Sequence, residues 1–93
     1  MGMGPSDDSG WSTRDADRVT EAAAMRLLLQ LHPIQLTVEE LIRELAGERP
    51  EFAERDSVER AVRDLAGAGL LHRSGELLTP TRAALRLSEL LDR

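Results

Sequence analysis

The chain holds few residues of the types that enzymes use for covalent or metal chemistry. It has no cysteine, so a thiol nucleophile and thiolate zinc sites are excluded. Neither histidine, His32 or His72, has a carboxylate partner at a spacing typical of metal ligands. A glycine-rich phosphate loop, a nucleophile elbow and a carboxylate pair are also missing. We therefore expect a binding protein without enzymatic activity, cofactor or metal.

Arginine supplies the binding chemistry that remains. All 12 basic residues of the Lys and Arg types are arginine, a planar cation suited to carboxylates and phosphates. The formal net charge is nevertheless -5, and non-specific affinity for nucleic acid comes almost entirely from phosphate neutralisation. Any contact with DNA must therefore come from a local patch.

The composition predicts one small helical domain. With 93 residues and only 2% aromatics, the core must be built from Leu, Val, Ile and Ala. No apolar run approaches the roughly 20 residues that cross a bilayer, so we expect a cytoplasmic protein without membrane contact. Residues 1–13 are predicted to be a disordered leader and residues 14–93 the folded domain. Trp11 either stays free or packs back onto that domain.

Apolar spacing predicts two helices before the middle of the chain. The first covers residues 14–31 and is stopped by His32 and Pro33. Residues 34–36 then alternate as a short strand does. Thr37 and Glu40 form a capping-box pattern that opens the second helix, and Gly47 is placed to end it in a left-handed conformation.

A third helix is predicted to begin after a polar connection over residues 48–55. Phe52, as the only large apolar group there, is expected to anchor that connection in the core. Asp56 is the predicted cap. The inner face of the helix is then formed by Val58, Ala61, Val62 and Leu65.

The last third of the chain predicts a hairpin and a fourth helix. Ser74 and Gly75 lie between two short apolar runs, a pattern typical of a tight turn between strands. Thr79 followed by Pro80 then predicts a cap and first position for a helix that ends near Asp92.

The order helix, short strand, helix, helix, hairpin, helix resembles the winged helix-turn-helix family. Residues 57–85, reading SVERAVRDLAGAGLLHRSGELLTPTRAAL, resemble bacterial regulators of the MarR, PadR and Fur-like kinds, without selecting one of them. The resemblance implies a mainly α fold with a small β-hairpin wing, and a transcriptional regulator that binds double-stranded DNA.

In that family the third helix enters the major groove of DNA. On this chain, Arg60 and Arg63 lie one turn apart and are expected to reach guanine edges or phosphates. Arg73 lies where a wing touches the DNA backbone, and Arg55 lies just before the predicted helix. The full set implied to bind DNA is Arg55, Ser57, Arg60, Arg63, Arg73 and Ser74.

Charge supports an alternative. Arg60 and Arg63 can instead pair with Glu59, Asp64 and Glu44 as a solvated surface. Residues 37–56 carry three arginines against seven carboxylates, which would repel phosphates. The alternative is a winged helix that serves as a protein-interaction or dimerisation module, with this acidic face as its working surface.

The first and fourth helices carry more apolar residues than one core face needs. We expect some of them to pack against a second copy, forming a homodimer, unless they are isolated apolar groups on the surface. The predicted interface consists of Met25, Leu29, Leu85, Leu87, Leu90 and Leu91.

Overall fold

The computed structural model describes residues 13–92. Its elements are α1 (Thr13–Leu31), β1 (Leu36–Thr37), α2 (Val38–Ala46), α3 (Phe52–Gly67), β2 (Leu71–Ser74), β3 (Leu77–Pro80) and α4 (Arg82–Leu91). This is the predicted order, in a mainly helical chain with a small antiparallel sheet. The helix α1 begins one residue earlier than predicted. The predictions for the rest of the leader and for Trp11 lie outside the described residues.

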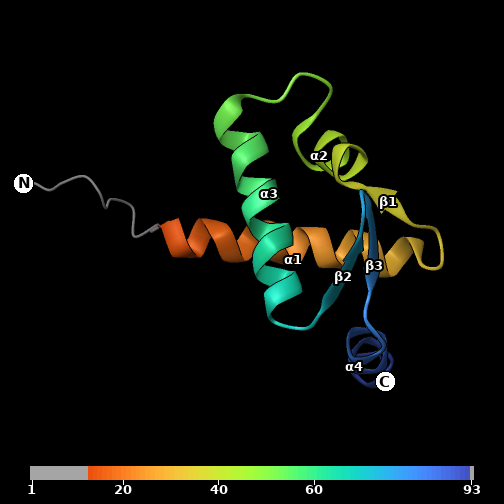
Figure 1. The fold of residues 1–93 in the computed structure, drawn as a ribbon. Coiled ribbons are helices and arrows are strands. Elements are labelled where there is room, and N and C mark those ends of the chain that lie inside the picture. The colour runs from red at the N-terminus through yellow and green to blue at the C-terminus, as the bar shows by residue number, and fades with distance from the viewer. Residues whose placement is uncertain (1–12, 93) are drawn as a thin grey trace, which may run out of the picture.

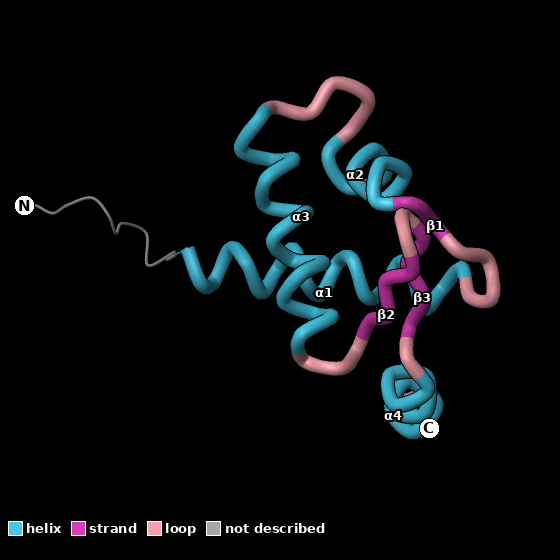
Figure 2. The backbone as a smooth tube through the Cα atoms, in the orientation of Figure 1, coloured by secondary structure: helices cyan, strands magenta, loops and turns pink. Residues whose placement is uncertain are grey.

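The helices surround the sheet as Figure 1 shows, with α3 passing in front of the long α1. The strand order is β1-β3-β2, with both pairings antiparallel. Leu78 of β3 therefore lies between Leu36 of β1 and Arg73 of β2. In Figure 2 the strands run between α2 at one end and α4 at the other.

One aliphatic core joins the elements. Leu28 of α1, Leu41 and Ile42 of α2, Val62 of α3 and Leu78 of β3 are its largest fully buried side chains. Polar residues separate these apolar positions along each segment. Each amphipathic element therefore buries its apolar side against the others. The described core contains no aromatic ring.

The capping box of α2 is confirmed. Thr37 Oγ1 accepts from the Glu40 amide at 3.1 Å, and the Thr37 amide donates to Glu40 Oε1 at 2.8 Å. Gly47 follows the helix with φ 92° and ψ 178°. The predicted positive φ is therefore present, but ψ places Gly47 in an extended region that only glycine adopts readily.

The start of α3 differs from the prediction. The helix begins at Phe52, where the Glu51 amide donates to Glu54 Oε1 at 2.9 Å, so Asp56 lies inside the helix and is not its cap. Phe52 is 83% exposed, and its predicted role as a core anchor is wrong. Residues 52–54 are all exposed, so the first turn of α3 lies outside the aliphatic core.

The start of α4 also differs. Pro80 is buried in β3, paired with Leu71, and the helix is capped instead by Thr81. Thr81 Oγ1 accepts from the Ala84 amide at 3.2 Å and donates to Gly69 O at 2.8 Å. Strand pairing thus holds Thr79 and Pro80 in extended conformation, and the helix starts two residues later.

The two smaller β predictions shift by a residue or more. The hairpin turn is at Gly75 and Glu76, since Ser74 is still paired with Leu77. Gly75 has φ 62°, which suits a tight turn between strands. The short strand occupies Leu36–Thr37 and leaves Ile34 exposed before it.

Candidate functional site

The buried side of α3 is confirmed and fixes which residues point away from the core. Val58, Ala61, Val62 and Leu65 are all buried. The opposite side of the helix presents four charged residues that are exposed: Asp56, Glu59, Arg63 and Asp64. This outward side was the predicted DNA-reading surface, and carboxylates outnumber arginines on it.

The sequence led us to expect an unpaired Arg60 on the outward side of α3, but in the structure its side chain is paired. Its Nη2 donates to Asp17 Oδ1 of α1 at 2.9 Å, and its Nη1 donates to Asp56 Oδ2 at 2.7 Å. The hydrogen bond and charge of Asp17 raise the pKa of Arg60; desolvation opposes them, and the charge and hydrogen bond of Asp56 add smaller raising effects. Arg60 therefore stays charged and bridges α1 to α3. Arg60 pairs with neither Glu59 nor Asp64, the two α3 carboxylates that the alternative prediction gave as its partners.

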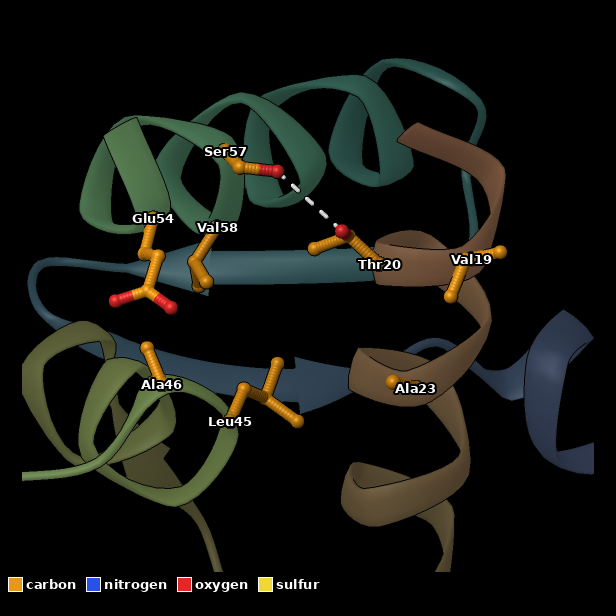
Figure 3. A pocket seen from close by; sticks show the side chains of 8 residues that line it. All are labelled: Val19, Thr20, Ala23, Leu45, Ala46, Glu54, Ser57 and Val58. Atoms are coloured by element: carbon orange, nitrogen blue, oxygen red, sulfur yellow. Dashed lines mark hydrogen bonds between the residues drawn. The ribbon is translucent and has the colours of Figure 1, made fainter. Parts of the chain in front are cut away.

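Ser57, which was predicted to contact DNA, also faces α1. Its Oγ lies 3.3 Å from Thr20 Oγ1, and the side chain is half-buried. Figure 3 shows this pair at the rim of a groove between α1, α2 and α3. The groove has a volume of about 280 Å³ and is lined mainly by small aliphatic side chains, among them Ala23, Leu45 and Val58.

Arg55 pairs with the second helix. It lies within α3, and its Nη1 is 2.7 Å from Glu39 Oε2 of α2. The hydrogen bond and the charge of Glu39 raise the pKa of Arg55. Glu39, one carboxylate of the acidic segment 37–56, is therefore paired with Arg55, which was expected to bind a phosphate.

The hairpin presents a carboxylate at its turn. Arg73 Nε donates to Gly75 O at 3.1 Å, and its Nη2 lies 3.9 Å from Glu76 Oε2. Ser74 is exposed beside it. Arg73, which was predicted to contact DNA, thus interacts with the turn of its own hairpin.

Arg63 is the member of the predicted arginine set that keeps an open side chain. It is exposed, and within residues 13–92 it has no hydrogen bond or ion pair. Arg60 and Arg63 lie within one turn of the same helix, but the side chain of Arg60 is paired with carboxylates and that of Arg63 is not, within the described residues.

The predicted dimer residues fall on α1 and α4. Met25 and Leu29 are half-buried on α1. On α4, Leu87, Leu90 and Leu91 are 50%, 58% and 76% exposed. We call these three the leucine face. Leu85, also predicted, is half-buried and does not belong to it.

A groove joins the two helices beside the leucine face. This α1–α4 groove has a volume of about 240 Å³, and Met25 and Leu29 form one wall while Leu87 and Leu91 form the other. Leu70 and Ala84 also line it, and both were missed from sequence. The double leucine at positions 70 and 71 was the available signal: Leu71 begins β2 and is buried, whereas Leu70 just before it is half-buried.

Residues 13–92 hold no group of three or more His, Cys, Asp or Glu residues able to bind a metal ion, and both histidines are exposed. None of the helices described is long and apolar enough to span a membrane.

Comparisons with known proteins leave the chain without an assigned relative. No family model matches it, and neither the curated proteins nor the solved structures contain a significant match.

Proposed function

We propose that this chain is a winged-helix domain that works as a protein-interaction module, with its leucine face and the α1–α4 groove as the docking surface. The winged-helix assignment is supported by the element order and by the sheet order β1-β3-β2, with the hairpin following α3. The observation that carries the interaction function is the exposure of Leu87, Leu90 and Leu91 on one short helix.

Exposed apolar residues are common on proteins when they are scattered, but a contiguous group beside a groove marks an interaction site. The leucine face adjoins an apolar groove whose walls come from two helices far apart in the sequence. Leucines exposed in this way lose contact with water when a partner covers them, and this burial drives association.

Charge favours this surface over α3 and the hairpin. Residues 52–80 carry four arginines and five carboxylates. Three of those arginines, Arg55, Arg60 and Arg73, already contact carboxylates of this chain. A phosphate backbone approaching α3 would therefore meet net negative charge, which weakens binding.

Photo-crosslinking in the source cell tests the proposal. The photoreactive residue p-benzoylphenylalanine replaces Leu90, and in matched control chains it replaces Ile34 or Asp64, all of which are exposed. We expect protein adducts from position 90 and none from the control positions 34 and 64. Adducts that form equally at all three positions, or none at position 90, would contradict an interaction function of α4.

A second candidate function is weak binding of duplex DNA, favoured by the open side chain of Arg63 on the outward side of α3. A titration of mixed-sequence duplex at low and moderate salt tests it. Arg63→Ala should lower affinity and reduce the salt dependence by about one released counterion, whereas Arg86→Ala on α4 serves as the control. No retention of duplex at low salt eliminates this candidate.

A further inference from the structure

The geometry points to a binding site for a small organic amine in the groove between α1, α2 and α3, which we call the three-helix groove (Figure 3). The ammonium group of the ligand donates to Glu54, and its apolar body fills the groove. None of the residues that line this groove also lines the α1–α4 groove, so the site goes beyond the interaction function proposed above. It is carried by the lining of the groove, the acceptors at its rim and the charge around it.

The three-helix groove has an apolar interior to which all three helices contribute. Its aliphatic lining includes Ala23 of α1, Leu45 and Ala46 of α2, and Val58 of α3. Val19, also in the lining, is 55% exposed. An apolar cavity of about 150 Å³ is enough to hold a benzene ring, and this groove has about 280 Å³. A single ring or a short branched alkyl group therefore fits, and its contact with Val19 would remove apolar surface from water.

The two hydroxyl groups of the groove offer acceptors to a ligand. Thr20 Oγ1 donates its single proton to Ala16 O, 3.1 Å away. In the contact with Ser57 Oγ at 3.3 Å, Thr20 is therefore the acceptor and Ser57 the donor. Both hydroxyl protons are thus used within the chain, and only lone pairs remain for a bound molecule.

Glu54 supplies a charged acceptor at the same groove. Its Oε1 accepts from the Glu51 amide at 2.9 Å and caps α3. Figure 3 shows its carboxylate between α3 and Ala46 of α2. Among the residues that the structure describes, no cation pairs with Glu54. Its second oxygen is therefore left to bind a positively charged group.

Charge favours a cation over an anion in the three-helix groove. Residues 44–54, which contribute three of the lining residues, carry four carboxylates and one arginine. The polar side chains of the lining, Thr20, Glu54 and Ser57, all present acceptors. A carboxylate or phosphate ligand would be repelled and would find no side-chain donor. An ammonium group is attracted and donates up to three hydrogen bonds, so the groove fits a primary amine on a compact apolar body.

An NMR titration of the ¹⁵N-labelled 93-residue chain with benzylamine tests the site. Amide signals of residues 19–23, 45–46 and 54–58 should shift with a dissociation constant of about 1 mM, as expected for a small ligand in an open groove. Benzyl alcohol, which keeps the ring but lacks the charge, should bind about threefold more weakly, and benzoate should not bind measurably. The site is overturned if these signals do not saturate by about 20 mM benzylamine, or if the alcohol or benzoate binds as tightly as the amine.

Glu54→Gln tests the charge while keeping the helix cap. The side-chain carbonyl of glutamine can accept from the Glu51 amide as Glu54 does, so α3 keeps its start. The variant should bind benzylamine about threefold more weakly and benzyl alcohol as before. Glu59→Gln, an equal loss of charge at an exposed position of α3 outside the groove, should change neither. Equal effects of the two variants on benzylamine, or no effect of Glu54→Gln, overturn the assigned role of Glu54.

Ala23→Leu tests the apolar interior. The larger side chain fills part of the groove and should weaken binding of both benzylamine and benzyl alcohol at least about fivefold. Ala22→Leu adds the same volume at an exposed neighbouring position outside the groove and should leave both unchanged. Thermal unfolding checks that both variants fold, and Glu54→Gln decides the outcome if Ala23→Leu does not. Unchanged binding in a folded Ala23→Leu variant overturns the placement of the ligand in this groove.

Discussion

The guanidinium of Arg60 on α3 is held by Asp17 of α1, with Nη2 and Oδ1 2.9 Å apart. This ion pair joins two helices whose contributing residues are 43 positions apart in the chain. The helix pattern placed Arg60 on a solvent-facing surface, whereas in the structure Arg60 links α3 to α1.

We expect Arg60→Ala to lower the melting temperature and Arg63→Ala to leave it nearly unchanged. The first removes a donor from both Asp17 and Asp56. The second removes an exposed side chain without an ion pair in the described residues, a type of change worth within about 0.5 kcal/mol. Thermal unfolding followed by circular dichroism measures both, and equal losses would contradict the structural role of Arg60.

The effect of Arg60→Ala should not depend on pH across the neutral range. Because the pKa of Arg60 is raised in the folded protein, its stabilising contribution is present below the unfolded-state value and is lost only in strong alkali. Melting temperatures of both proteins between about pH 6 and 9, well above the usual carboxylate pKa, should therefore differ by a constant amount. A difference that grows or vanishes within this window would contradict the pairing.

Leu28→Ala should be strongly destabilising. Leu28 is fully buried at the centre of the aliphatic core, and such truncations lower the free energy of unfolding by about 2–5 kcal/mol. Ile34→Ala is the matched control because its side chain is largely exposed. Urea denaturation at one fixed protein concentration measures both, since association would make stability concentration-dependent. A small effect at Leu28 would contradict the described core.

Thr81→Ala should lower the free energy of unfolding by about 1–2 kcal/mol, at the upper end for loss of a helix cap. The hydroxyl of Thr81 both accepts from the Ala84 amide and donates to Gly69 O, so two hydrogen bonds are lost together. Thr81→Ser keeps the hydroxyl and should retain most of the stability. An equal loss in both variants would show that the methyl group, and not the hydroxyl, is what matters.

Two glycine-to-alanine changes should act in opposite directions. Gly47 has φ 92°, which alanine adopts only with strain, so Gly47→Ala is expected to cost at least about 1 kcal/mol. Gly67 is helical at the end of α3 and has open space around an added Cβ. Gly67→Ala should therefore stabilise by about 0.4–1 kcal/mol. Urea denaturation measures both, and the same sign for the two changes would contradict the backbone described.

Local signals in the sequence determined the parts of the fold whose interactions span a few residues. Thr37 and Glu40 cap each other across one turn, and the spacing of Val58, Ala61, Val62 and Leu65 sets the buried side of α3. These interactions depend only on neighbouring positions and helical geometry. The sequence therefore predicts them without knowledge of the rest of the chain.

The tertiary structure decided every feature that depends on a distant segment. Pairing of Pro80 with Leu71 moves the start of α4 to Thr81, and Asp17 removes Arg60 from the outward side of α3. Of the predicted dimer residues, packing brings Met25 and Leu29 beside Leu87 and Leu91. In the first two cases a local preference worth about 1 kcal/mol is outweighed by contacts made with another element. The pattern of one segment cannot specify such contacts, because the contacting residue lies elsewhere in the chain.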